Sequence, residues 1–327
     1  MFDILTLHKG KVRVGKLDEV AQKDKISLID VVHPTNIELE KVSKMSDIDI
    51  SVLKELIDPA ERPRTEEYGK NSIIIYRYPI HTKKEVRTSS IVIIISKEHN
   101  YLFVIQKETD HLIDSLKNLK EDAKVNIFKH GVSYVLYKFL DNISDRFFKE
   151  IEEIEAETEK IEKKILTNSK RSYIKEILDL KRTLTYFHKA IIANRDVISS
   201  IEKGQLANVD KKILPLIKEV YYDLSQLNEL EETRKEILTG TLDIHMSATS
   251  NNLNIVMKRL TVMAALVWIP TLIAAIYGMN FGQPLHPEVS PLNMPELSWF
   301  YGYPFALSLM ATSVVAMYFW FKKQKWI

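Results

Sequence analysis

The chain has 327 residues, of which 28% are charged and 45% hydrophobic, so its composition is that of a folded protein rather than a disordered one. The net charge is only +2, and Lys and Arg are interleaved with Asp and Glu, which argues against an extended basic face for nucleic acid. The absence of cysteine excludes disulfides and thiolate metal sites. Residues 1–5 lack the basic and apolar regions of a cleaved signal peptide, and none is expected.

Residues 1–125 are expected to form an α/β cytoplasmic domain. Alternating apolar and polar positions in residues 1–32 predict short strands, and the Ile-, Val- and Tyr-rich segments 71–78, 87–96 and 101–106 predict further strands. The segment 87–96 is so apolar that we expect it to be central. Residues 10–16 superficially match a phosphate-binding loop but lack the Ser or Thr after the Lys, which favours a hairpin.

Two short helices are predicted within this domain, because capping side chains and acids occur at the start of segments 36–45 and 49–57. No Ser-His-Asp or His-x-x-x-His spacing is present, so the sequence does not predict an enzyme. Regulation or assembly is the expected role of the domain.

Residues 126–205 are expected to form an antiparallel helical hairpin that is broken around 167–169, since apolar residues recur there every three to four positions. Its first arm is rich in glutamate. A solvated helix face with Glu and Lys four residues apart is the favoured interpretation, and attraction of divalent cations is the alternative. The glutamates are Glu150, Glu152, Glu153, Glu155, Glu157, Glu159 and Glu162.

A stalk helix is predicted over residues 206–259, beginning near 209 or 215. No further proline occurs before Pro270, so we expect the helix to continue unbroken into the apolar segment that follows. Residues 243–275 alone would be about 48 Å long at about 1.5 Å per residue.

Residues 260–327 are expected to form a transmembrane hairpin with spans at about 260–277 and 303–321. Each span approaches the roughly 20 residues that cross a bilayer, and neither contains a charge. Basic residues flank the two spans, and the loop between the spans contains none. By the positive-inside rule, we expect the loop on the external side of the membrane and both termini in the cytoplasm. The protein is therefore expected in the cell membrane as a multi-pass protein in contact with lipid. The basic residues are Lys258 and Arg259 before the first span, and the C-terminal cluster Lys322, Lys323 and Lys325.

The first span ends in Tyr-Gly-Met-Asn-Phe at residues 277–281, and Met-Pro-Glu-Leu follows at 294–297 before the second span and its Lys-rich last turn. This arrangement resembles the CorA family of magnesium channels. The triplet is a specific signal of this family because it lies between two C-terminal spans; its residues are Gly278, Met279 and Asn280. The loop after the triplet carries Glu288 and Glu296. The resemblance is strong over residues 221–326 and architectural before them.

One face of the predicted stalk and first span is mostly small or polar. At about 100° per residue its members fall within roughly 120°. A single hairpin cannot enclose a path for an ion, so we infer that several copies of the chain assemble around an axis lined by this face. We call it the pore face. Close packing by small residues is the alternative explanation. The pore face comprises Asp243, Ser247, Ser250, Asn254, Met257, Thr261, Ala264, Trp268, Thr271 and Ala275.

The resemblance implies a homopentameric funnel that carries hydrated Mg²⁺. Mg²⁺ keeps its water, so the side-chain oxygen of Asn280 would accept hydrogen bonds from that water in a ring at the entrance. Gly278 would permit a turn that a Cβ would obstruct, and Met279 would pack rather than coordinate. Ala275, where many members have Gly, and the bulky Trp268 depart from the family pattern.

Further roles follow from the resemblance alone. Asn254 matches a second pore asparagine, and Met257 with Leu260 match a hydrophobic constriction. Asp243 matches an acidic ring at the cytoplasmic mouth, while Glu219 matches an acid that helps to bind regulatory Mg²⁺ between protomers. The partner of Glu219 is expected within residues 1–130.

The function expected is passive, potential-driven influx of Mg²⁺, with Co²⁺ as a second candidate cargo and with closure when cytoplasmic Mg²⁺ is high. Mg²⁺ is thus both transported ion and regulatory ligand. No protein substrate or nucleic acid is expected. Two alternatives remain open: a zinc-transporting relative of the same fold, and a membrane-anchored helical scaffold or sensor that conducts nothing.

Overall fold

The structure, a computed structural model, describes residues 2–8, 10–15, 25–82, 86–96, 98–108, 113–167, 172–279, 294, 296 and 299–326. The chain divides into two compact units, Met1–Asp243 and Ile244–Ile327. One helix, α7 (Leu214–Tyr277), belongs to both units.

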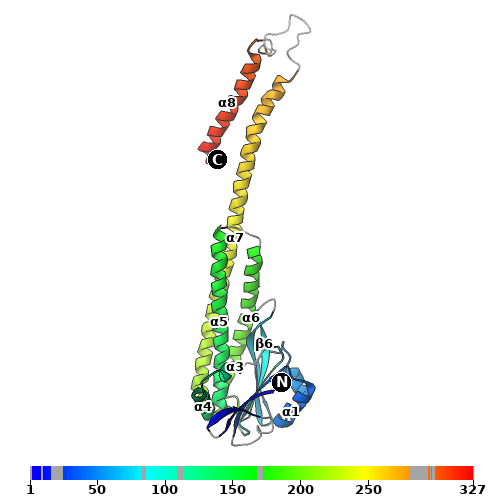
Figure 1. The fold of residues 1–327 in the computed structure, drawn as a ribbon, viewed down its shortest axis with the longest axis vertical. Helices are drawn as coiled ribbons and strands as arrows, with labels where there is room; N and C mark the ends of the chain where they lie inside the picture. Colours follow the sequence, from blue (N-terminus) through cyan, green and yellow to red (C-terminus); the bar gives the residue numbers. More distant parts are fainter. Residues whose placement is uncertain are drawn as a thin grey trace. The chain divides into compact units, whose positions relative to one another are not determined.

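The first unit contains a β-sheet beside long helices (Figure 1). The sheet has seven strands in the order β2-β1-β3-β7-β6-β5-β4. Neighbouring strands are antiparallel, except for the parallel pair β3 and β7. The strands are β1 (Phe2–His8), β2 (Lys11–Val14), β3 (Ile26–Val32), β4 (Arg64–Tyr68), β5 (Asn71–His81), β6 (Val86–Ser96) and β7 (Tyr101–Gln106).

The predicted strands are confirmed, and β1 and β2 form the expected hairpin, in which Gly10 has φ of +76°. The very apolar β6 is internal as expected, although β7 rather than β6 is the middle strand. The sequence did not predict β4. Its residues Arg-Thr-Glu-Glu-Tyr are polar because it is an edge strand that pairs only with β5.

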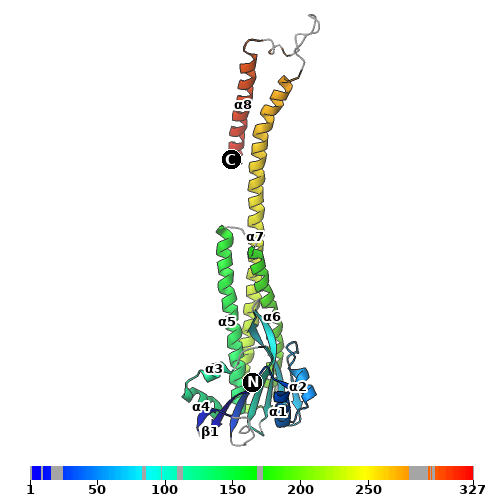
Figure 2. The same cartoon turned by 45° about the vertical axis from the view of Figure 1, so that its right-hand side comes forward.

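Alternate strand residues point to opposite faces of the sheet, and each face is covered by helices (Figure 2). On one face, Ile73 and Ile75 pack with α1 (Asn36–Ser46) and α2 (Ile50–Leu56). On the other face, Ile74 and Tyr76 belong to the core shared with the long helices. The predicted starts of α1 and α2 are confirmed: Thr35 forms a capping box with Glu38, and Asp49 caps α2.

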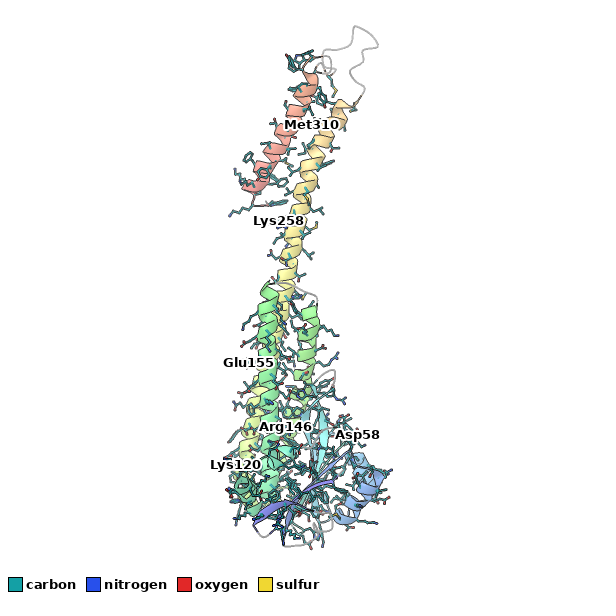
Figure 3. The ribbon with its side chains drawn as sticks, in the orientation of Figure 1. Asp58, Lys120, Arg146, Glu155, Lys258 and Met310 are labelled. Atoms are coloured by element: carbon teal, nitrogen blue, oxygen red, sulfur yellow. The ribbon has the colours of Figure 1, made fainter. Side chains whose placement is uncertain are left out.

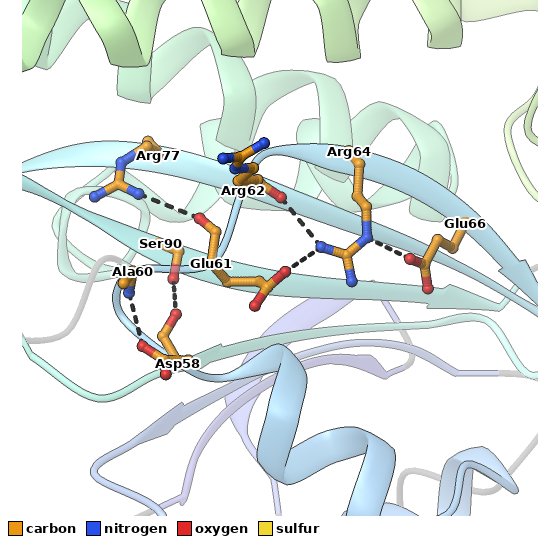
Figure 4. Close-up of polar contacts among 8 residues, drawn as sticks. All are labelled: Asp58, Ala60, Glu61, Arg62, Arg64, Glu66, Arg77 and Ser90. Atoms are coloured by element: carbon orange, nitrogen blue, oxygen red, sulfur yellow. Dashed lines mark hydrogen bonds and ion pairs between the residues drawn. The ribbon is translucent and has the colours of Figure 1, made fainter.

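The segment between α2 and β4 is fixed to the sheet by arginine contacts (Figure 4). The guanidinium of Arg64 pairs with the carboxylates of Glu61 and Glu66. Arg77 of β5 donates from Nη1 to the carbonyl oxygen of Glu61 at 3.2 Å. These contacts hold the chain where it enters the edge strand.

The helical part begins with α3 (Asp114–Lys117) and α4 (Glu121–Lys129), earlier than the expected start near 126. Gly131, with φ of +94°, separates α4 from α5 (Val132–Thr167), because the left-handed conformation interrupts the helix. Helix α5 ends at Thr167 and α6 (Ser172–Glu202) follows, while residues 168 and 169, where most of the predicted break falls, lie outside the described residues. A short 3₁₀ helix, Lys211–Ile213, precedes α7.

Helices α5, α6 and α7 share the core of the first unit. Phe147 of α5 and Phe187 of α6 are both fully buried and meet edge to face, with ring centroids 5.2 Å apart. Asn194 of α6 is also fully buried, and its amide bonds to both backbone groups of Arg77: Arg77 N–H donates to Oδ1 at 2.8 Å, and Nδ2 donates to the carbonyl oxygen at 2.7 Å. Because β4 begins only at Arg64, opposite Ile75, Arg77 has no partner in β4, and Asn194 takes the place of that missing strand partner.

Several of the α5 glutamates have partners on their own helix or on α7. Glu155, labelled in Figure 3, pairs with Arg234 of α7 at 2.6 Å. Glu159 pairs with Lys163 at 3.5 Å, and Glu162 accepts a hydrogen bond from the hydroxyl of Thr241 at 2.7 Å.

Candidate ion pathway

The pore face is carried by α7, which runs without interruption from Leu214 to Tyr277 as the sequence predicts. From Asn254 to Ala275 every residue of this face is exposed in the chain, and Leu260 beside it is exposed as well. Trp268 is 72% exposed, and Met257 is 58% exposed. These side chains do not pack in the core of the chain itself, so they can contact another copy of the chain, water or lipid.

A different face of the same stretch is covered. Val262 is 5% exposed, and it lines a groove with Leu266 and with Tyr318 of α8 (Gly302–Lys323). At about 100° per residue, Val262 and Leu266 lie on the side of α7 roughly opposite the pore face. On this side of α7, Val262 is buried and Leu266 is half-buried, whereas the pore face is exposed throughout.

Two threonines on the pore face donate their hydroxyl protons within the helix. Thr261 Oγ1 donates to the carbonyl oxygen of Met257 at 2.9 Å, and Thr271 Oγ1 donates to that of Val267 at 2.8 Å. Such back-bonding leaves the oxygen lone pairs as acceptors. The face can therefore accept hydrogen bonds from the water of a hydrated cation.

At the end of α7, the N–H of Gly278 donates to the carbonyl oxygen of Ala274 at 2.9 Å. A Cβ on Gly278 would lie 3.3 Å from that oxygen. Glycine is therefore favoured at this position by the close approach of the Ala274 carbonyl and not by a left-handed backbone conformation. Met279 is 48% exposed, and the packing expected of it is not made within the chain.

The hydroxyl of Tyr277 donates to Glu296 Oε1 at 3.2 Å, a link that the sequence did not reveal. Asn280, Phe281 and Glu288 lie outside the described residues.

The two acids expected at the regulatory site do not meet within one chain. Both Glu219 and Asp243 are exposed on α7, and their separation of 24 residues (243 − 219) corresponds to about 36 Å of helix. Tyr137 of α5 donates its hydroxyl proton to Glu219 Oε2 at 3.5 Å. Among the residues that the structure describes, no group of three or more His, Asp or Glu side chains is arranged to hold a metal ion. The role of Glu219 and Asp243, and a partner from residues 1–130 of another copy, stay predictions.

Asp223 of α7 lies in the electrostatic field of Glu219 and of two aspartates on α5. Partial burial raises the pKa of Asp223, and the negative charges of Asp141, Asp145 and Glu219 raise it further. Burial and the charge of Asp141 also raise the pKa of Asp145. The cause is the same for both groups: like charges and loss of water disfavour the ionised form.

We expect Asp223→Asn to stabilise the protein slightly at neutral pH, by about 0.5 kcal/mol at most, since the group is partly exposed. Because folding raises the pKa of this carboxyl, its ionised form lowers the stability of the folded protein at neutral pH. This destabilisation disappears as the pH falls through the raised pKa toward the ordinary pKa of about 4. The variant's higher Tm should therefore converge on that of the wild type in acid. A gain in Tm that persists unchanged at acidic pH would contradict this electrostatic explanation.

Comparisons with known proteins agree with this architecture. A family model described as CorA-like Mg²⁺ transporter protein matches residues 23–323. The cobalt/magnesium transport protein CorA of Methanocaldococcus jannaschii is 32% identical over 331 residues and covers 100% of both chains. The cobalt/magnesium transport protein CorA of Thermotoga maritima is 29% identical, covering 90% of this chain and 81% of that one.

Solved structures show the same fold. The complete structure of the CorA magnesium transporter from Methanocaldococcus jannaschii matches with a TM-score of 0.84 and 29% identity, and the match covers 99% of both chains. The full-length CmaX protein matches with a TM-score of 0.72 at 14% identity, which shows likeness of fold alone.

The second unit contains the helices that qualify by length and composition as membrane spans: the apolar part of α7, and α8. They correspond to the two predicted spans, and the family match extends across both of them. A membrane location and a transport role rather than an enzymatic one follow. This chain belongs to the CorA-like Mg²⁺ transporter family.

Proposed function

We propose that five copies of the chain enclose a pore along the pore face of α7 and conduct hydrated Mg²⁺ passively into the cell, with Co²⁺ as a second cargo. The observation that carries the proposal is the contrast between two sides of one helix: the pore face is exposed from Asn254 to Ala275, whereas Val262 on the other side is buried. Family membership supports the same reading.

The pore face suits an ion that keeps its water. From Asn254 onward it offers an amide, two hydroxyl oxygens and small side chains, but no carboxylate. A carboxylate ring within the span would hold a dication too strongly for rapid release. The face also lacks His and Cys, the ligands of a soft-ligand zinc path, so no observation favours the zinc alternative.

Membrane potential supplies the driving force in this proposal. A charge moving to the negative side gains about 2.3 kcal/mol per 100 mV, which is roughly 4.6 kcal/mol for a dication. The proposed orientation, with both termini in the cytoplasm, rests on the basic residues that flank the two spans and are absent from the loop.

Reconstitution into proteoliposomes with an internal Mg²⁺-sensitive dye tests this function. Uptake should rise when a negative-inside potential is imposed, and it should need no nucleotide. A purified, oligomeric protein that gives no flux at any potential would instead support the scaffold alternative.

We further propose that cytoplasmic Mg²⁺ closes the pore by neutralising carboxylates that face one another between copies, Glu219 and Asp243 among them. Both acids are exposed, and about 36 Å of helix separates them, so we expect each to act with groups of a neighbouring copy rather than with the other acid. Replacing both by Ala should raise the internal Mg²⁺ concentration for half-inhibition about tenfold, equivalent to about 1.4 kcal/mol of ion binding. Flux is measured against internal Mg²⁺ in the same vesicles.

The matched control removes two other exposed acids from α7, Glu229 and Glu236. It lowers the charge of the helix equally, so its inhibition curve should stay near that of the wild type. Equal shifts in the two double variants would mean that overall charge, and not a bridging ion, sets the inhibition.

A further inference from the structure

A groove of about 580 Å³ lies between α7 and α8 within the second unit. Three of its lining residues are cationic: Lys258 and Arg259 of α7, and Lys325 just after α8. The remaining lining residues are apolar or aromatic: Ile255, Val262, Met263, Leu266, Tyr318 and Trp326. Lys258 is labelled on α7 in Figure 3. The groove thus combines a basic rim with an apolar floor.

The three cations have no anionic partner in the described part of the second unit. No ion pair there involves Lys258, Arg259 or Lys325, and the acid described in that unit, Glu296, is bonded to Tyr277 at the other end of α7. Three like charges around one groove repel one another, and an anion between them would relieve that repulsion.

The last turn of α8 places the third cation at the groove. Lys325 has φ of +57°, and its N–H donates to the carbonyl oxygen of Lys322, while the N–H of Trp326 donates to that of Phe321. These are the two hydrogen bonds of a Schellman motif. The Trp326 ring stacks on buried Phe321 with centroids 5.7 Å apart, so Lys325 and Trp326 are held by both backbone and ring contacts.

The groove faces away from the proposed pore. At about 100° per residue, the lining residues of α7 centre roughly 150° from the centre of the pore face. The basic rim lies where the charge-free spans begin and end, which is where we expect the membrane surface. Positive-inside orientation puts that surface in the cytoplasmic leaflet, which carries the anionic lipids.

We propose that this groove binds one anionic phospholipid per protomer, with the phosphate between Lys258, Arg259 and Lys325 and an acyl chain along Val262 and Leu266. The aromatic residues Tyr318 and Trp326 would lie at the level of the headgroup, which amphipathic rings favour. The assignment rests on the proposed membrane orientation, but it does not require that the pore conduct.

The test uses the full chain in mixed micelles and the quenching of tryptophan fluorescence by brominated phosphatidylglycerol or phosphatidylcholine. The difference between the wild type and Trp326→Phe isolates the signal of Trp326. We expect saturable quenching of Trp326 by phosphatidylglycerol at concentrations where phosphatidylcholine has little effect. Each basic residue near an anionic surface is worth about fivefold in affinity, so Lys258→Gln with Arg259→Gln should weaken binding roughly 30-fold.

Two further variants separate a built site from general attraction. Lys322→Gln with Lys323→Gln removes the same charge from the C-terminal end of α8 but outside the groove lining. A phosphate held in the groove should make this loss of affinity clearly smaller than that of Lys258→Gln with Arg259→Gln. Lys325→Asn keeps a residue that tolerates positive φ and should lose about fivefold. Equal losses in the two double variants would overturn the site in favour of nonspecific surface charge.

Two other outcomes would also overturn the proposal. Competition by glycerol 3-phosphate as strong as that by the lipid would mean that the groove binds a free phosphate group and not a lipid. Failure of every lipid to quench Trp326 in the intact oligomer would mean that a neighbouring copy covers the groove. Because binding is measured without ion flux, loss of lipid preference with normal Mg²⁺ uptake, or the reverse, separates this proposal from the proposed transport function.

Discussion

Replacing Asn280 with Ala is expected to reduce potential-driven Mg²⁺ uptake to the background of empty vesicles. Mg²⁺ is recognised through its hydration shell, and the amide oxygen at the outer end of the first span would accept hydrogen bonds from those waters. In the proposed pentamer, one copy per protomer would make a ring, so a single substitution would remove every member of that ring at once. Uptake under an imposed negative-inside potential is the measurement, with the oligomer verified by size in the same preparation.

The matched control is Asn252→Ala, which removes an exposed amide from α7 away from the pore face. It should conduct like the wild type. Asn280→Gln retains the amide but moves its oxygen by one methylene, so an intermediate flux is expected if position matters as well as chemistry. Normal uptake by an intact oligomer of Asn280→Ala would remove Asn280 from the selectivity site.

Replacing Asn194 with Leu is expected to destabilise the first unit by about 2–6 kcal/mol. The amide of Asn194 satisfies the N–H and the carbonyl of Arg77 in a fully buried position, at 2.8 and 2.7 Å. Leu has a similar size but no polar atoms, so it would leave both backbone groups without partners, at about 1–3 kcal/mol for each group. Thermal unfolding of the purified protein, followed by circular dichroism, should show a Tm lower by several degrees.

Asp196→Leu provides the comparison, since Asp196 is exposed on the same helix two residues further on. Its Tm should change little, because surface substitutions outside special contacts usually fall within about 0.5 kcal/mol. Similar losses for the two variants would indicate that leucine on α6, and not the loss of the bonds to Arg77, causes the destabilisation.

Much of the architecture could be predicted because its signals are local. The helices α5 and α6 of the hairpin follow from apolar residues every three to four positions. The continuous α7 follows from the lack of proline between Pro215 and Pro270. Strand β4 was missed because an edge strand needs no apolar pattern, and the separate α4 was missed because a single glycine, Gly131, interrupts an otherwise helical pattern.

The sequence by itself determined the two charge-free spans, the face of α7 proposed to line the pore, and the family motif between the spans, because hydropathy and helical periodicity are properties of short windows. Only the tertiary structure decided which distant groups meet. Asn194 reaches Arg77 across 117 positions, Tyr137 reaches Glu219 across 82, and Lys258 shares a groove with Lys325. The physical reason is that such contacts arise when whole elements pack to bury apolar area, and no local pattern records which polar side chains that packing brings together.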